Sequence, residues 1–166
     1  MGHDAGTTAP RVARVAPTLT VRAAVLQDAP RLAALSAVLG YRVTEEAVGE
    51  RLTRLLGRAD DTVLVAELPP GRIVGWLHGS DRELLESGRR CEILGLVVDA
   101  EHRRQGVGRR LVEAVEAWAT RRGIEEIVVR SNVLRAESHP FYERLGYVRA
   151  KTQHSYRRRL SGGATP

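Results

Sequence analysis

Along this chain the spacing of hydrophobic residues changes between that of a strand and that of a helix, and these changes predict its strands and helices. Short β-rich runs cover residues 19–25, 62–67, 73–79, 93–98 and 126–131, which favours strands. Apolar residues recur at helical spacing over 29–39, 45–56 and 106–122, and a shorter helix is expected over 138–145. With two closing strands at 147–151 and 153–159, the pattern predicts an α/β fold whose mixed sheet has six to seven strands, with about four helices.

The connections indicate how these elements are joined. Pro69, Pro70 and Gly71 form a turn that makes a hairpin of its flanking strands. A short helical turn is expected within the polar stretch 81–90. The order strand, helix, strand over 93–131 implies a parallel, right-handed βαβ core. The ends lack periodicity, so we expect flexible tails at 1–17 and 161–166 around one domain at 18–160.

Composition limits the class of protein. The chain has 166 residues, enough for one hydrophobic core, and no apolar run is long enough to span a membrane. Its first residues do not form a secretory signal. The single cysteine, Cys91, lies in an apolar strand pattern, which predicts a core thiol and a reducing, cytoplasmic setting.

The charge of the chain raises the question of nucleic acid. The formal net charge is +6, but acidic residues are interleaved with the arginines and aromatic residues make up only 4%. A base-stacking surface is therefore not expected, although a basic nucleic-acid-binding module remains one rival reading. The histidines show no metal-ligand spacing, so no metal is predicted.

The stretch after the strand 93–98 has the layout of a phosphate-binding loop. Arg103, Arg104 and Gln105 lead to Gly106, Val107 and Gly108, where a strongly amphipathic helix begins. Glycines permit close approach of the backbone to a ligand, and the free amides of a first helical turn attract anions. The alternative is an ordinary solvated helix N-terminus. The spacing matches neither a Walker loop nor a dinucleotide fingerprint.

Two motifs together resemble a known family. Arg103, Gly106 and Gly108 fill the Arg/Gln-x-x-Gly-x-Gly/Ala segment of the GCN5-related N-acetyltransferase (GNAT) superfamily. The run Phe141-Tyr142-Glu143-Arg144-Leu145-Gly146-Tyr147 resembles that family's second signature. The resemblance covers residues 19–160. It implies a single GNAT-like domain and transfer of an acetyl group from acetyl-CoA to an amine.

The same resemblance implies which residues contact the cofactor. Leu96, Val97 and Val98 would offer backbone groups to the pantetheine arm, beside a bulge where two central strands diverge. The pyrophosphate would be held by the loop and its continuation, that is by Arg103, Arg104, Gln105, Gly106, Val107, Gly108 and Arg109. Asn132 and Ser138 are further cofactor candidates, although Asn132 is also a plain turn residue and Ser138 a helix cap.

Two residues are candidates for proton transfer. Tyr142 occupies the family's general-acid position, and ordinary pKa values of about 10 for a phenol and about 8.5 for a thiol allow it to protonate the departing sulfur. Its alternative role is packing beneath the cofactor. Counting in twos along the strand places Glu92 on one face with Leu94, Leu96 and Val98. A carboxylate in apolar surroundings accepts a proton more readily, so Glu92 is the candidate base. A solvated strand start, with water as the base, is the alternative.

The sequence thus predicts an acetyl-CoA-dependent N-acetyltransferase. The acceptor would be a primary amine of a small molecule that is aminoglycoside-like, amino-acid-like or a polyamine, and a protein amine stays open. Tyr41 and Arg42 lie in the early helical region that would cover the acceptor, where helix packing is their alternative role. No membrane partner is expected, and a homodimer is left open. A non-catalytic acyl-CoA-binding or sensing domain is the main rival.

Overall fold

The computed structural model describes residues 18–132 and 138–160. The chain divides into two compact units, one extending to Val129 and the other beginning at Arg130. The predicted tails, 1–17 and 161–166, lie outside the described residues. Within the described ranges, no helix combines the length and apolarity needed to cross a membrane.

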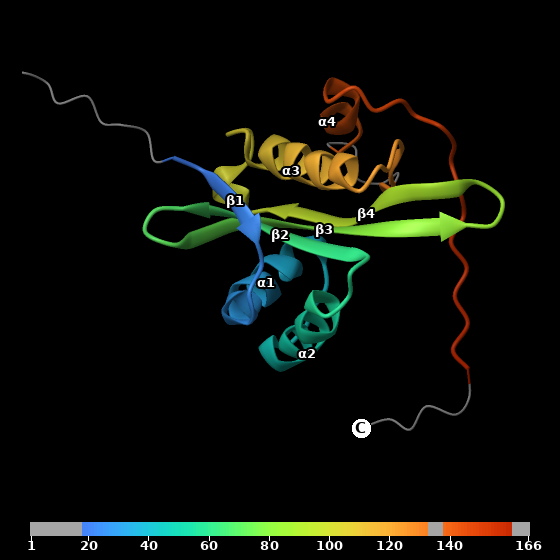
Figure 1. Ribbon diagram of the computed structural model, residues 1–166. Helices are drawn as coiled ribbons and strands as arrows, with labels where there is room; N and C mark the ends of the chain where they lie inside the picture. Colours follow the sequence, from blue (N-terminus) through green and yellow to red (C-terminus); the bar gives the residue numbers. More distant parts are fainter. Residues whose placement is uncertain (1–17, 133–137, 161–166) are drawn as a thin grey trace, which may run out of the picture. The chain divides into compact units, whose positions relative to one another are not determined.

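A five-stranded sheet in the order β1-β2-β3-β4-β5 forms the centre of the first unit (Figure 1). Neighbouring strands from β1 to β4 are antiparallel, whereas β5 is parallel to β4. This arrangement confirms the predicted mixed sheet with a parallel pair. The strands are β1 (Thr20–Ala23), β2 (Asp61–Leu68), β3 (Arg72–Leu84), β4 (Gly88–Val98) and β5 (Ile127–Val129).

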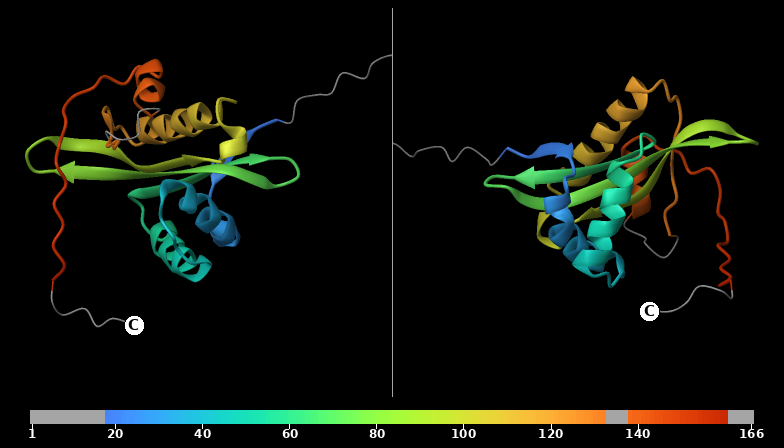
Figure 2. Two further views of the ribbon diagram at one scale, coloured as in Figure 1. Left: turned by 180° about the vertical axis from the view of Figure 1, so that it is seen from behind. Right: turned by 60° about the horizontal axis from the view of Figure 1, so that its bottom comes forward.

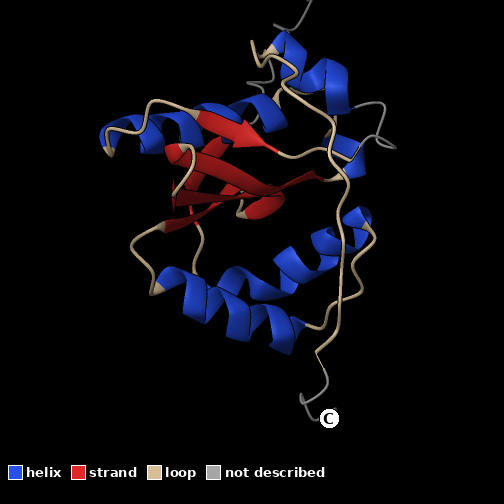
Figure 3. Cartoon of the chain, turned by 90° about the vertical axis from the view of Figure 1, so that its right-hand side faces the viewer, coloured by secondary structure: helices blue, strands red, loops and turns tan. Residues whose placement is uncertain are grey.

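Helices cover both faces of this sheet. α1 (Ala29–Ser36) and α2 (Glu45–Leu56) lie on one face, and α3 (Val107–Arg121) lies on the other, as Figure 2 and the side view in Figure 3 show. α2 begins where the sequence indicates, because Thr44 Oγ1 accepts a hydrogen bond from the Ala47 amide at 3.2 Å. Short 3₁₀ turns stand at Leu26–Asp28, Ala37–Leu39 and Ala100–His102. The second unit contains α4 (Ser138–Arg144).

The number of strands predicted from the sequence was wrong. The described residues form five strands rather than six to seven, because 147–151 and 153–159 are neither strand nor helix. A strand needs a partner for its backbone groups, and an apolar face to bury. Residues 150–160 are all exposed and contain three consecutive arginines at Arg157–Arg159, so this segment has no face of its own to bury.

The stretch 81–90 also departs from its prediction. It contains no helical turn; instead β3 and β4 continue as a hairpin in which Asp81 opposes Cys91 and Leu84 opposes Gly88. Gly88 supplies a positive φ of 73° where the chain reverses. The side chains of this ribbon are mostly polar and exposed, so the alternation of apolar and polar residues that reveals a half-buried strand is missing.

Two glycines of β3 bring α3 close to the sheet. A Cβ on Gly75 would lie 2.9 Å from the Val97 carbonyl oxygen, and one on Gly79 would lie 2.6 Å from Val115 Cγ2. These contacts are closer than packed atoms tolerate. The core between α3 and the sheet therefore depends on the absence of side chains at these two positions.

We expect Gly79→Ala to lower the free energy of unfolding by about 1–3 kcal/mol, because the added methyl group overpacks the core against Val115. Chemical denaturation measures this loss. Gly49→Ala is the matched control: its Cβ would meet only Ala29 Cβ, at 3.9 Å, and alanine favours a helix interior. Equal stability of the two variants would contradict the tight packing of α3.

An ion cluster fastens the β3–β4 hairpin to the end of α3. Asp81 accepts two hydrogen bonds from Arg89, at 2.9 and 2.7 Å, and two from Arg122, at 3.0 and 2.9 Å. Arg122 also lies over the Trp118 ring, 5.0 Å from its centroid. The hydrogen bonds from Arg89, together with those from Arg122, hold the pKa of Asp81 below its usual range despite its burial.

Because the folded-state pKa of Asp81 is depressed, its contribution to stability is present above the ordinary carboxyl pKa and is lost as the pH falls through the folded value. We expect Asp81→Asn to cost about 2 kcal/mol at pH 7 and to flatten the loss of stability on acidification. Denaturation between neutral and acidic pH checks this. Glu86→Gln, an exposed change in the same hairpin, should leave the curve unchanged; an identical curve for Asp81→Asn would count against the cluster.

Candidate active site

Strand β4 is paired with β5 over only part of its length. β5 pairs with β4 only over Cys91 to Ile93, so Leu94 to Val98 have no β5 partner within the described residues. On the other side of β4, Ile93 opposes Gly79 and Gly95 opposes His78. Leu94 is therefore the extra residue of a β-bulge, and bulges bend and twist a strand. The predicted divergence of two central strands beside a bulge lies at this point.

The bulge corrects the predicted face of Glu92. Leu96 opposes Leu77 and Val98 opposes Gly75, on the face covered by α3. Glu92 opposes Ser80, which lies on the other face together with His78 and Trp76. The extra residue at Leu94 shifts the alternation by one, so that Glu92 does not share a face with Leu96 and Val98.

Glu92 itself is buried, as the prediction of apolar surroundings requires, with 6% of its surface exposed. Arg82 Nε lies 3.9 Å from Glu92 Oε2. Its other neighbours in the sheet are Ser80 and Val128, which oppose it on β3 and β5. A solvated strand start does not describe this position, and the carboxylate is held on the α1 and α2 face of the sheet.

The phosphate-binding loop has the backbone that its glycines indicate. Gly106 is the N-cap of α3 with φ of 82°, and no side chain caps the helix. Arg104 also has a positive φ, 59°, which is uncommon for a residue with a side chain. Gln105 Nε2 donates to the Glu101 carbonyl at 2.9 Å and fastens the loop to the preceding turn.

These conformations leave the first amides of α3 available to an anion. Val107 is buried and anchors the helix start in the core, while Arg103, Arg104 and Arg109 are exposed at its mouth. The amides carry the positive end of the helix dipole, and guanidinium groups add attraction for phosphate. Residues 103–109 thus form an arginine-rich helix start, which follows the open edge of β4 after the turn Ala100–His102.

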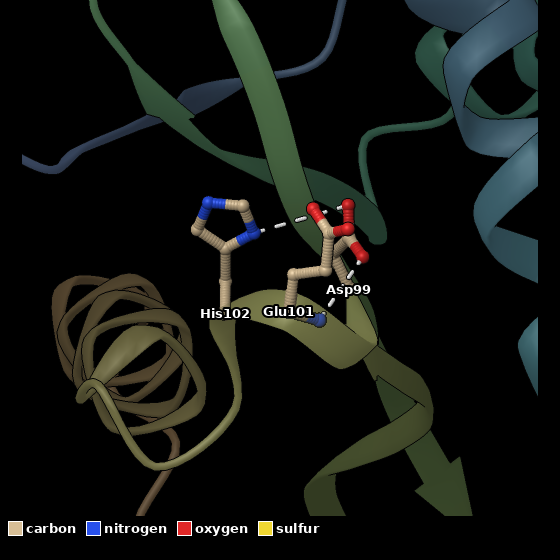
Figure 4. A group of neighbouring side chains, drawn as sticks. All are labelled: Asp99, Glu101 and His102. Atoms are coloured by element: carbon tan, nitrogen blue, oxygen red, sulfur yellow. Dashed lines mark hydrogen bonds and ion pairs between the residues drawn. The ribbon is translucent and has the colours of Figure 1, made fainter.

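Asp99, Glu101 and His102 form a cluster between β4 and the loop (Figure 4). Arg31 donates to Asp99 at 2.5 Å and Arg72 to Glu101 at 3.2 Å. Burial opposes ionisation of Asp99, but the Glu101 amide and Arg31 more than offset it, so the pKa of Asp99 is lowered. Because guanidinium groups already neutralise both carboxylates, the cluster serves to hold α1 and the loop in place rather than to bind a cation.

The second unit carries the remaining predicted site residues. Tyr142 packs edge-to-face on Phe141 and on Tyr147, with ring centroids 5.0 and 5.6 Å away. Ser138 Oγ lies 2.5 Å from Ser131 Oγ. His139 Nε2 donates to the Asn132 carbonyl at 3.2 Å. Ser138 and Tyr142 thus share α4, His139 of the same helix reaches the Asn132 carbonyl, and the Tyr142 ring has two aromatic neighbours.

A cavity of about 350 Å³ lies within the first unit, between the sheet and the helices α1 and α2. Sequence reasoning named Tyr41 for this region, and Tyr41 lines the cavity, whereas Arg42 does not. No sequence pattern identified the other lining residues, since only strand pairing and helix packing bring them together. The lining residues are Leu32, Ser36, Leu39, Tyr41, Val43, Val48, Arg51, Leu52, Leu55, Val63, Trp76, His78, Leu94 and Gly95.

Comparison with known proteins decides the family. The model of the acetyltransferase (GNAT) family matches residues 31–147. The chain belongs to this family. The match includes both motifs on which the resemblance was based, so the family predicted from the sequence is confirmed.

Individual relatives agree with this assignment. The chain is 28% identical over 137 residues to aminoglycoside N(6')-acetyltransferase type 1 of Stenotrophomonas maltophilia, which covers 80% of this chain and 88% of that protein. It is 32% identical over 75 residues to human N-acetyltransferase 8, covering 45% of this chain, but spans only about a third (32%) of that relative's length.

A solved structure shares the fold. An aminoglycoside N-acetyltransferase in complex with CoA superposes with a TM-score of 0.80, at 19% identity, covering 90% of this chain and all (100%) of that one. The predicted enzyme class and the predicted use of acetyl-CoA therefore agree with the family and with a CoA-bound neighbour.

We expect Gly106→Ala to weaken CoA binding by up to about tenfold, because alanine at a positive φ costs about 1–2 kcal/mol and displaces the loop amides. Calorimetric titration with CoA measures the change. Gly123→Ala carries the same penalty at the opposite end of α3, with φ of 70° and nothing near the added Cβ. It should reduce stability and leave CoA affinity unchanged. Equal CoA affinity in the two variants would argue against the loop.

Proposed function

We propose that this protein transfers the acetyl group of acetyl-CoA to a primary amine of a small molecule. The observation that supports this most strongly is the succession of two features: the open edge of β4 from Leu94 is followed, after the turn Ala100–His102, by the uncapped amides of α3 after Gly106. An extended arm that ends in a pyrophosphate fits such an edge followed by such an anion site.

In this proposal the backbone of Leu96, Val97 and Val98 positions the arm of the cosubstrate, and the loop 103–109 binds its pyrophosphate. Asn132 and Ser138 are proposed to contact the arm. Acetyl-CoA supplies the activated acetyl group as a thioester. Placing the acetyl group beside the bulge at Leu94 orients it for attack, since positioning alone removes a large entropic barrier.

Two proton transfers remain for side chains. We assign Glu92 as the base that takes a proton from the acceptor ammonium, directly or through water, because it is a buried carboxylate two residues from the bulge. Tyr142 is assigned as the acid that protonates the departing sulfur, since its ring is held between Phe141 and Tyr147. The transfer is direct, so it uses neither Cys91 nor a covalent enzyme intermediate.

Cys91 is unsuited to the role of nucleophile. The thiol is completely buried, and this burial raises its pKa to about 11. A thiol that stays protonated near neutral pH is a poor nucleophile. Its position against Gly79, 3.8 Å from where a Cβ would stand, confirms the prediction of a core thiol. A cytoplasmic setting stays part of the proposal.

The proposed class of acceptor is supported by the names of two relatives. Two of the matched proteins are aminoglycoside N-acetyltransferases by name, and aminoglycosides, amino acids and polyamines are all small primary amines. A rival function is acyl-CoA binding without transfer. It would retain the loop and the open edge but release no CoA from acetyl-CoA in the presence of amines.

We expect Tyr142→Phe to lower kcat by about 100-fold or more, the usual contribution of a general acid, while CoA affinity is retained. A thiol-release assay over a panel of amines measures this. Tyr147→Phe, the same change on the neighbouring ring, is the control and should keep most of the activity. Full turnover by Tyr142→Phe with an unaltered pH profile would remove Tyr142 from the mechanism.

Glu92→Gln should lower kcat, because the amide cannot accept the ammonium proton. The same thiol-release assay reports this. Glu83→Gln, an exposed change on β3, is the control and should keep its activity. Full turnover by Glu92→Gln would assign the proton to water instead.

A further inference from the structure

The cavity of the first unit reaches the bulge of β4. Leu94 and Gly95, which form the bulge, line it together with Trp76 and His78 of β3. A ring carbon of Trp76 stands only 2.9 Å from where a Cβ on Gly95 would lie, so the indole packs directly on this backbone. If the proposed function holds, the acetyl group lies beside the same bulge, which makes this cavity the acceptor site.

Apolar side chains make up most of the cavity wall. Nine of its members are Leu, Val or Trp: Leu32, Leu39, Val43, Val48, Leu52, Leu55, Val63, Trp76 and Leu94. Its volume of about 350 Å³ lies at the small end of ligand pockets. Burial of an apolar group here would be favourable by the hydrophobic effect.

The wall of the cavity also lacks negative charge. Among its lining residues Arg51 is the only one with a permanent charge, and none carries a carboxylate. Arg51, an exposed residue of α2, is therefore the fixed positive charge that a ligand in this cavity would meet.

Two acids on this face of the sheet lie beside cationic groups. Asp61 lies 2.7 Å from Arg58 Nε and accepts from His78 Nε2 at 3.2 Å. Glu92, the proposed base, lies 3.9 Å from Arg82, and neither acid lines the cavity. In the proposed function one ammonium group of the acceptor meets Glu92 near the bulge, but the further ammonium groups of a polycation would lose their hydration in this cavity without gaining a carboxylate partner.

From this combination we infer that the acceptor is a monoamine with an apolar body, aryl or branched alkyl, whose anionic substituent pairs with Arg51. A hydrophobic amino acid has this chemistry, and a polycationic aminoglycoside does not. This inference rests on the proposed function and narrows it. It also separates the protein from the aminoglycoside-modifying enzymes that it resembles, because charge complementarity selects partners more strongly than shared fold.

Trp76 allows binding to be read without any turnover. The chain has two tryptophans, and Trp118 stands on α3, on the opposite face of the sheet. In Trp118→Phe the fluorescence arises from Trp76 alone. We expect saturable changes in its emission with L-phenylalanine and with 2-phenylethylamine, and none with kanamycin. Calorimetry on the wild-type protein repeats the titrations if Trp118→Phe is unstable.

Reversal of its charge tests the role of Arg51. Arg51→Glu should weaken L-phenylalanine binding by about tenfold, the usual cost of a lost charged hydrogen bond, and should leave 2-phenylethylamine, which has no carboxylate, bound as well or better. Arg54→Glu is the matched control on α2, because Arg54 is exposed and does not line the cavity. It should alter neither affinity.

Tighter binding of kanamycin than of phenylalanine would overturn the inference, and so would equal losses in Arg51→Glu and Arg54→Glu. An absence of any Trp76 response to the monoamines would equally refute it. Failure of the proposed function looks different: CoA would not bind, or no amine would release CoA from acetyl-CoA, although the Trp76 titrations still saturate.

Discussion

The hydrogen-bonded pairing of β4 with β5 ends at Ile93, and the candidate site depends on this interruption. Backbone amides and carbonyls that lose a strand partner must find other partners or remain in water. A bulge at Leu94, in the pairing of β4 with β3, comes directly after this interruption and bends the strand. The sheet thereby provides a length of extended backbone that an elongated ligand can use.

The same bulge separates the two functions of β4. Beyond it, Leu96 and Val98 turn toward α3 and belong to the core that supports the phosphate-binding loop. At the bulge, Leu94 and Gly95 face α1 and α2 and line the cavity. In the proposed function one strand would position the cosubstrate along its edge and the acceptor on its face, and the reacting groups would meet at the bulge.

Arginine side chains occupy two kinds of position in this chain. Arg89 and Arg122 neutralise Asp81, and Arg31 neutralises Asp99, so these residues fix the hairpin and the loop. Those of the loop itself, Arg104 and Arg109, are exposed beside an anion site. Because ion pairs contribute no net charge, the excess of +6 rests on other basic residues, and the proposed function gives a role to those of the loop.

Caps, turns and glycine conformations that depend on residues close together in the chain could be predicted from the sequence. Thr44 capped its helix as expected, the hairpin turned at Gly71, and the glycine at 106 took the positive φ that its loop needs. Such features are determined by residues that are neighbours along the chain, so a single sequence contains all the information they require. The two family motifs are of the same kind, which is why the family could be identified from them.

Long-range features came only from the tertiary structure. The face of Glu92 was assigned wrongly, because a bulge is created by the register between two strands and not by either strand alone. The cavity that joins Arg51, Trp76 and His78 likewise depends on how helices pack on a sheet. The amino-acid order thus determined most of the helices, the Thr44 cap and the backbone of the loop at Gly106, whereas pairing between distant strands decided how many strands form and which side chains share a face and line the cavity.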